Sequence, residues 1–286
     1  MSDVLVVKLG GANLAAEASL LAAVAEEARR RPVIVVHGGG ARLTAWQERL
    51  GGPARFEDGL RVTDAATLEI ALAVLRGLVN GELVAALRRL GADAVGLSGI
   101  DGGLLVAERV PAAGFVARVS DVRRGLLDAL LVGGQLPVVA PLATDETGAI
   151  CNVNADDVAA GISRGLGARQ LVLLSDVPGV RGPDGTILAT LDGPEAERLL
   201  AAGTVGGGMR PKVRAALRAV AALPGSEAVI ADGRVPDALA RALDDPAFGT
   251  RIRGPRESGP RPAEASARAR RSTRPAGTPA PARRST

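Results

Sequence analysis

A short apolar stretch that runs into a lysine and two glycines constrains this chain more than any other feature. Residues 4–7, Val-Leu-Val-Val, have the composition of a strand buried on both faces of a parallel sheet. Lys8 and Leu9 follow, then Gly10 and Gly11, and a helical pattern begins near Glu17. Free backbone N–H groups at such a turn bind anions, and Lys8 adds a positive charge. The stretch therefore predicts an anion site at the carboxyl end of the first strand.

Lysine is scarce in this chain, which makes its position informative. Of 35 Lys and Arg residues only two are Lys, and both Lys8 and Lys212 lie beside glycines. An ammonium is a compact point charge, and the planar fork of Arg does not replace it where a phosphate must be held at one point. Two lysines could also have survived by chance, but their shared surroundings favour a function in phosphate binding.

The sequence repeats the order of strand, glycine turn and helix. Val-Ile-Val-Val at 33–36 leads into His37 and three glycines, and a helix is expected from about 41 to 50. Further apolar strands are expected at 94–99, 137–140, 170–174 and 227–231, with helices between them. This alternation predicts an α/β fold with a parallel sheet and helical crossovers. His37, the only His, fits a hydrogen-bonded turn residue better than a general base.

Between the second and third strands, residues 51–62 are rich in turn formers and predict a hairpin or flap. Thr63 or Asp64 then caps a long helical region that Gly91 ends. Arg61, just before that cap, could pair with a carboxylate, although a surface arginine is the alternative.

Asn152, Asn154 and Asp156 occupy alternate positions before another helix. If this segment is extended, the two amides and the carboxylate point to one side, whereas capping of the following helix is the alternative. The neighbouring Cys151 is the only Cys, so it excludes an internal disulfide and a cysteine zinc cluster and fits a reducing cytosol. A small buried filler is its simplest role.

The positive charge of the chain is concentrated at one end. Nine Arg and two Glu give residues 253–286 a net charge of +7, which leaves −3 for residues 1–252 of the total of +4. We expect 253–286 to be a disordered tail rich in Arg, Pro and Ala. Aromatic residues make up only 1% of the chain, which argues against base stacking, so nucleic acid is an unlikely partner beyond non-specific binding. No apolar run approaches the roughly 20 residues of a membrane span, and no signal peptide is apparent, so a cytoplasmic protein is expected.

Seven segments, in their order along the chain, resemble the amino acid kinase family. They are residues 7–11, 37–40, 59–63, 96–99, 152–156, 208–212 and 249–250. The glycine loops are common in proteins, but Asn-x-Asn-Ala-Asp and Gly-Met-x-Pro-Lys are much more specific. The likeness covers residues 4–252 and is strongest to the members that phosphorylate N-acetyl-L-glutamate.

This resemblance implies a three-layer αβα sandwich with a mainly parallel central sheet. Residues 1–168 would form an N-terminal lobe for acyl-amino-acid binding and dimerisation, and residues 169–252 a C-terminal lobe for ATP. The implied reaction transfers the γ-phosphoryl group of MgATP to the side-chain carboxylate of N-acetyl-L-glutamate. The product, N-acetyl-L-glutamyl 5-phosphate, belongs to arginine biosynthesis.

The resemblance also implies roles for individual residues. Lys8 and Lys212 would neutralise charge on the transferring phosphoryl group, and Asp156 would hold both ammonium groups. Substrate-binding residues would be Gly39, Gly40, Arg61, Asn152 and Asn154. ATP-binding residues would be Gly10, Gly11, Gly38, Asp176, Gly179, Val180, Arg181, Thr204 and Gly206. Mg²⁺ would be coordinated mainly by the nucleotide phosphates, so no protein metal ligand is expected.

The chemistry agrees with this picture, because a carboxylate with a reference pKa of about 4.3 is already a nucleophile at neutral pH and needs no general base. Two alternatives stay open: a lysine-biosynthesis kinase acting on aminoadipate held by an acidic carrier protein, and a non-catalytic binding protein on the same fold. Binding of such a carrier would require positively charged residues around the opening of the substrate site. Because the first strand starts at Val4, we expect a homodimer that arginine does not inhibit rather than an arginine-inhibited hexamer. Neither a Walker A loop nor a dinucleotide-binding glycine motif is present.

Overall fold

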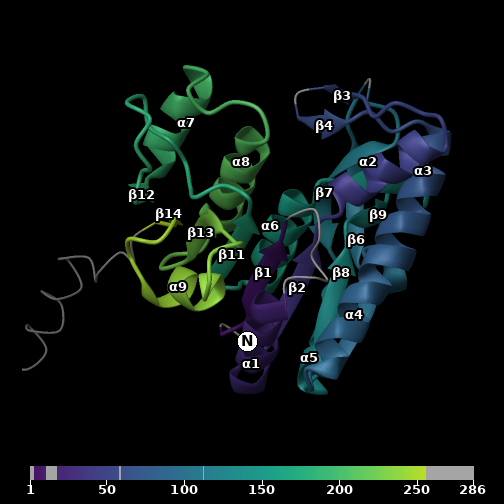
Figure 1. Ribbon diagram of the computed structural model, residues 1–286, viewed down its shortest axis with the longest axis horizontal. Helices are drawn as coiled ribbons and strands as arrows, with labels where there is room; N and C mark the ends of the chain where they lie inside the picture. The colour runs from purple at the N-terminus through teal and green to yellow at the C-terminus, as the bar shows by residue number, and fades with distance from the viewer. Residues whose placement is uncertain (1–2, 11–17, 58, 112, 256–286) are drawn as a thin grey trace, which may run out of the picture. The chain divides into compact units, whose positions relative to one another are not determined.

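The centre of the fold is a sheet in which β1 (Leu5–Leu9) lies between β2 (Val33–His37) and β11 (Gln170–Ser175) (Figure 1). The structure, a computed structural model, describes residues 3–10, 18–57, 59–111 and 113–255. The strand order is β12-β14-β13-β11-β1-β2-β8-β5, and every pairing is parallel except that of β13 with β14. The other strands are β5 (Ala94–Ser98), β8 (Leu136–Ala140), β12 (Thr190–Leu191), β13 (Glu227–Asp232) and β14 (Thr250–Arg253). The predicted α/β fold with a mainly parallel central sheet is confirmed.

Helices cover both faces of this sheet because alternate residues of a strand point to opposite sides. Val4 and Val6 belong to one buried cluster, and Leu5, Val7 and Leu9 belong to the other. The first cluster includes residues of α5 (Gly125–Val132), α6 (Ala155–Leu166), α7 (Gly193–Ala201) and α8 (Met209–Val220). The second includes residues of α1 (Ala18–Arg30), α2 (Gly40–Arg49), α4 (Asn80–Arg89) and α9 (Ala238–Asp244). The result is the three-layer αβα arrangement that the resemblance implied.

Two smaller β structures accompany the main sheet. The strands β6 (Leu105–Arg109), β7 (Val116–Val122), β9 (Leu142–Thr144) and β10 (Ile150–Val153) form a closed four-stranded unit. Within it, β6 and β7 pair in antiparallel orientation. β3 (Phe56–Glu57) pairs with β4 (Leu60–Arg61), which confirms the flap predicted for residues 51–62.

The helical region after the flap contains an unexpected segment. Asp64 caps α3 (Ala65–Ala71), as its side chain accepts a hydrogen bond from the Thr67 N–H at 2.8 Å, so the predicted cap is confirmed. Between α3 and α4, however, residues Leu72–Val79 (η2) form a π-helix. The whole run Ala65–Arg89 is long and apolar enough to cross a membrane, so the expectation that no apolar run reaches that length is wrong. It is weak evidence for a span, because a core helix passes the same test and this run buries Val74, Leu83 and Leu87.

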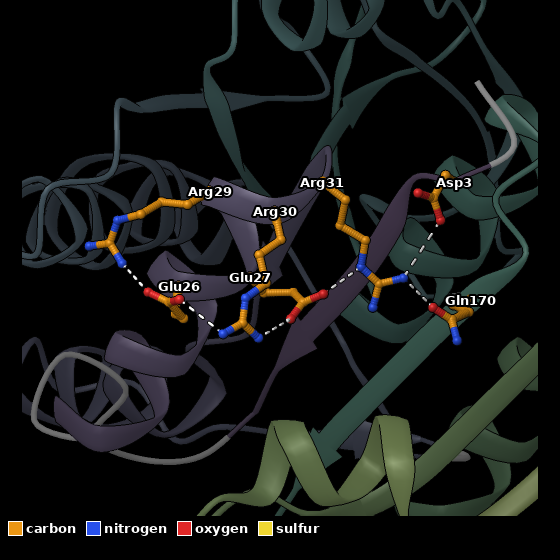
Figure 2. A network of polar contacts seen from close by, with 7 residues as sticks. All are labelled: Asp3, Glu26, Glu27, Arg29, Arg30, Arg31 and Gln170. Atoms are coloured by element: carbon orange, nitrogen blue, oxygen red, sulfur yellow. Dashed lines mark hydrogen bonds and ion pairs between the residues drawn. The ribbon is translucent and has the colours of Figure 1, made fainter.

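A polar network ties the amino-terminal edge of the sheet together (Figure 2). Arg31 bonds to Glu27 at 2.6 Å, forms an ion pair with Asp3 at 3.9 Å and donates to the side chain of Gln170 at the start of β11. Glu26 pairs with Arg29 and Arg30 on the same helix. Arg31, which follows α1, thereby links this helix to the start of β11 and to Asp3, which precedes β1, on the side of the sheet opposite the carboxyl ends of the strands.

Candidate active site

Three charged side chains meet beyond the carboxyl end of β1. Lys8 comes from β1, Asp156 from the first turn of α6 and Lys212 from the first turn of α8. The Nζ of Lys8 lies 2.9 Å from Oδ1 of Asp156, and the Nζ of Lys212 lies 3.0 Å from Oδ2. The three side chains are 7%, 4% and 15% exposed. The structure therefore brings the three predicted catalytic residues together, and each carboxylate oxygen faces a different ammonium group.

The electrostatics of this cluster favour an anionic ligand. Burial lowers the pKa of Lys8, and the charge of Lys212 lowers it further, while Asp156 opposes both effects. Burial also works against ionisation of Asp156, but the attraction of Lys8 and Lys212 outweighs it and holds the pKa of Asp156 below its usual value. Two ammonium groups around one carboxylate leave one positive charge uncompensated. A developing negative charge on a phosphoryl group would be stabilised there.

Gly10 leaves the space that the Lys8 ammonium occupies. A Cβ at position 10 would lie 2.8 Å from Nζ of Lys8 and 2.8 Å from the carbonyl oxygen of Leu174. The N–H of Gly10 already donates to that carbonyl at 2.8 Å, and the N–H of Gly38 donates to Leu9. Both N–H groups are thus already paired with carbonyl oxygens of the protein. Gly11, which was also expected to bind ATP, lies outside the described residues.

Gly39 and Gly40 are the glycines whose N–H groups are available. Gly39 precedes α2 with φ 138°, and a Cβ there would lie 2.7 Å from Cδ2 of Leu75. Among the described residues, neither glycine donates its N–H to an acceptor. These two groups lie at the N-terminus of a helix, where backbone amides attract anions.

His37 fixes the loop that carries these glycines. Its Nδ1 lies 2.7 Å from the carbonyl oxygen of Gly38, and its Nε2 lies 3.1 Å from Nδ2 of Asn80, which also donates to Val138 at 2.8 Å. Because the Asn80 amide donates, Nε2 accepts and the proton resides on Nδ1. Burial lowers the pKa of His37 to about 4. His37 is thus a neutral, hydrogen-bonded residue, in agreement with the sequence interpretation.

A cavity of about 220 Å³ opens beside the charged cluster. It collects nine predicted residues, namely Lys8, Gly38, Gly39, Gly40, Arg61, Asn152, Asn154, Asp156 and Lys212. Its apolar lining, which the sequence did not indicate, includes Leu43, Phe56, Leu60, Leu75 and Val116. The spacing of the glycines in the sequence indicated a binding site. These apolar residues show no such pattern, because they come from five different helices and strands. Within the described ranges, no three His, Cys, Asp or Glu side chains are grouped to hold a metal ion.

Arg61 is a buried cation in the wall of this cavity. It is 8% exposed and donates to the carbonyl oxygen of Gly40 at 2.9 Å, to Thr44 at 2.7 Å and to Gln47. Its guanidinium carbon lies 4.7 Å from the centre of the Phe56 ring. Burial lowers the pKa of Arg61, and no carboxylate of the described residues pairs with it. A ligand carboxylate would supply the missing counter-charge.

The alternating polar residues before α6 do not form one extended face. β10 ends at Val153, and Asn154 caps α6 by accepting a hydrogen bond from the Asp156 N–H at 2.8 Å. Asn152 is on the strand and donates to Thr63 at 3.1 Å. The extended interpretation is therefore wrong for the segment as a whole, and capping is correct for Asn154. Cys151 is fully buried, as expected.

The ATP-binding residues predicted between positions 176 and 206 do not line this cavity. They lie in the loop after β11 and between α7 and α8: Asp176, Gly179, Val180, Arg181, Thr204 and Gly206. The Val180 N–H donates to Oγ1 of Thr250 at 2.8 Å, and a Cβ at Gly179 would lie 2.7 Å from the same oxygen. Asp176, Arg181 and Thr204 are exposed.

The flap reaches across the cavity to the loop before α8. Gly59, in the turn between β3 and β4, has φ 80°. A Cβ there would lie 3.4 Å from the carbonyl oxygen of Gly207 and 3.5 Å from Cγ of Pro211. The two sides of the site, more than a hundred positions apart in sequence, are thus in close approach.

Comparison with known proteins identifies relatives along most of the chain. The model of the amino acid kinase family matches residues 3–232. An acetylglutamate kinase of Rubrobacter xylanophilus is 47% identical over 250 residues, covering 87% of this chain and 96% of the relative. One of a Synechococcus strain is 42% identical over 221 residues, covering 76% and 71%. A solved N-acetylglutamate synthase from Neisseria gonorrhoeae, complexed with coenzyme A and N-acetyl-glutamate, shares the fold with a TM-score of 0.77 at 23% identity, over 93% of this chain and 64% of that one.

Proposed function

The chain belongs to the amino acid kinase family, and from this premise we propose that it transfers the γ-phosphoryl group of ATP to the side-chain carboxylate of N-acetyl-L-glutamate. The product is N-acetyl-L-glutamyl 5-phosphate, and the pathway is arginine biosynthesis. Relatives named acetylglutamate kinase support the substrate. The observation that carries the proposal is the pair of ammonium groups on Asp156. This cluster lines the same cavity as Arg61, a buried arginine without a carboxylate partner among the described residues.

The cavity offers separate partners for the two ends of the substrate. The Arg61 guanidinium receives the α-carboxylate, and Asn152 and Asn154 fix the acylated amino acid beside it. The N–H groups of Gly39 and Gly40 face the reacting end from the start of α2. The apolar lining provides a place for the acetyl methyl group.

Transfer then needs alignment and charge neutralisation rather than proton removal. The substrate carboxylate is already ionised near pH 7, and His37 is neutral with both ring nitrogens bonded, so no general base takes part. Lys8 approaches the phosphoryl group from β1 and Lys212 approaches it from α8. Asp156 fixes both ammonium groups before the reactants arrive, which lowers the reorganisation needed during transfer.

We place ATP at the loops of the second lobe, residues 169–252. Asp176, Gly179, Val180, Arg181, Thr204 and Gly206 would line the nucleotide site there, with Gly10 and Gly38 beside its phosphates. Mg²⁺ bound to the phosphates supplies further charge neutralisation. Residues 1–168 would hold the acylated amino acid.

We also propose a cytoplasmic homodimer. Among the described strands β5 pairs only with β8, so one side of its hydrogen-bonding edge is open to a second chain. Light scattering should give twice the mass of a single chain. A hexamer, or inhibition of the purified enzyme by arginine, would contradict this assignment.

The substrate is tested by trapping the acyl phosphate with hydroxylamine. N-acetylglutamate, glutamate and N-acetyl-aminoadipate are offered in parallel with ATP. Lys8→Arg and Lys212→Arg keep the charge but change its shape, and we expect both to lose several orders of magnitude in rate. Arg89→Lys, the reverse exchange at an exposed position on α4, is the matched control and should retain activity. Turnover of a carrier-bound aminoadipate, with none of the three free substrates, would refute the proposal.

A further inference from the structure

A second cavity, of about 90 Å³, adjoins the first and is surrounded by arginines. Arg118 comes from β7, whereas Arg210, Arg214 and Arg218 come from α8. Asn154 lines both cavities. The proposed reaction uses none of the four arginines.

The charge of this cavity is poorly compensated. Asp157 is the one carboxylate that lines it, and it accepts hydrogen bonds from Arg218 and, at 2.9 Å, from the Val119 N–H. Arg118, Arg210 and Arg214 form no ion pair or side-chain hydrogen bond with any described residue. Glu108 lies opposite Arg118 in the β6–β7 ladder but makes no ion pair with it. Three positive charges therefore face one small space without partners from the described chain.

One arginine of α8, Arg210, also lies in the first turn of the helix, where the helix dipole disfavours a positive charge. Arg210, Arg214 and Arg218 recur every fourth residue, so they share one face of the helix at steps of roughly 6 Å. The first turn contains no acidic residue, although that end of a helix favours negative charge. Asp156 compensates Lys212 in this turn, but no described side chain compensates Arg210. An external anion would relieve this arrangement.

We propose that this arginine cavity binds a small oxyanion of the phosphate class, either inorganic phosphate or the phosphate group of a monoester. The forked guanidinium groups match phosphate oxygens in pairs, and they approach from two walls, β7 and α8. The small volume suits one tetrahedral oxyanion better than a nucleotide. Its occupant would contact Asn154, whose side chain positions the Asp156 N–H. The site shares Asn154 with the main cavity, but its arginines take no part in the proposed reaction.

Equilibrium dialysis of the full chain with radiolabelled inorganic phosphate tests this site, with ionic strength held constant by sodium chloride. Arg118→Gln and Arg214→Gln should each weaken one class of phosphate site by about tenfold or more. Arg89→Gln, an exposed arginine on α4 outside the cavity, should bind phosphate like the wild type. The thermal midpoint in chloride alone should be the same for all four proteins, because the exchanged side chains bond to no described residue.

Two further arms distinguish the possible occupants. Competition by glycerol phosphate would identify a monoester site, and failure to compete would leave inorganic phosphate as the ligand. Polyglutamate tests for an acidic protein partner. The proposal is wrong if both cavity variants bind phosphate as tightly as Arg89→Gln, or if they lose binding of polyglutamate alone.

Discussion

Between about pH 7.5 and about pH 5, acidification should destabilise this protein mainly through one side chain, His37. Its folded-state pKa is about 4, against an ordinary value of 6.5, because the ring is fully buried. A base whose pKa is depressed by folding takes up its proton more readily when unfolded, so stability is complete above about pH 6.5 and is lost as the pH falls toward 4. Two-state linkage between these values gives a loss of about 2 kcal/mol at about pH 5, and roughly 3 kcal/mol in total. Protonation of Nε2 would also set two donors against each other, since Asn80 already donates there.

Urea unfolding at about pH 7.5 and about pH 5 measures this loss, and thermal scans should show a midpoint lower by roughly 4–8 °C. His37→Gln is the control, because it keeps every carboxylate and removes the only imidazole of the chain. The difference between the two pH slopes therefore belongs to His37. Parallel slopes for the wild type and His37→Gln would refute the reasoning, and would mean that the ring is solvated or that its neighbours rearrange.

Three other changes test the site. Gly39→Ala places a side chain at φ 138°, with its Cβ only 2.7 Å from Leu75, so urea unfolding should show a loss of stability of about 1–3 kcal/mol. The control, Gly81→Ala on α4, has no atom within 4 Å of the new Cβ and should be neutral or stabilising. Asp156→Asn removes the charge that holds two ammonium groups at 2.9 and 3.0 Å, so kcat in the hydroxylamine assay should fall by about a hundredfold or more. An unchanged kcat would exclude Asp156 from the mechanism. Arg61→Lys keeps the positive charge but loses the forked guanidinium group, so KM for N-acetylglutamate should rise by about tenfold or more, with a smaller change in kcat. An unchanged KM would show that Arg61 does not bind the substrate.

The sheet was predictable from sequence because its signals are local. Runs of Val, Ile and Leu marked β1, β2 and β11, and glycine turns follow the first two of these strands. The alternation with helices indicated their parallel direction. Asp64 was recognisable as a helix cap for the same reason, because a few adjacent residues determine where a helix starts. The family resemblance added the assembly of Lys8, Asp156 and Lys212, which no local pattern contains.

What the sequence did not indicate depends on distant contacts. The tight packing at Gly10 depends on Leu174 and on the Lys8 ammonium, and the residues next to Gly10 in the sequence do not reveal the contact with Leu174. The apolar wall of the main cavity and the arginines of the second cavity are ordinary residues until the fold places them together. The π-helical turn is equally invisible, because its residues have the composition of any apolar helix.

That π-helical segment also means that a change in the length of the helix would alter the main cavity, which Leu75 lines. Leu72–Val79 places Leu75 against Gly39, while Asn80 immediately after it is held by His37 and Val138. A π-turn contains one residue more than the α-turn that it replaces. Deleting one residue here would restore regular winding and rotate the preceding side chains by about 100° relative to Asn80. A one-residue insertion or deletion in this helix would therefore reshape the main cavity without replacing any residue that lines it.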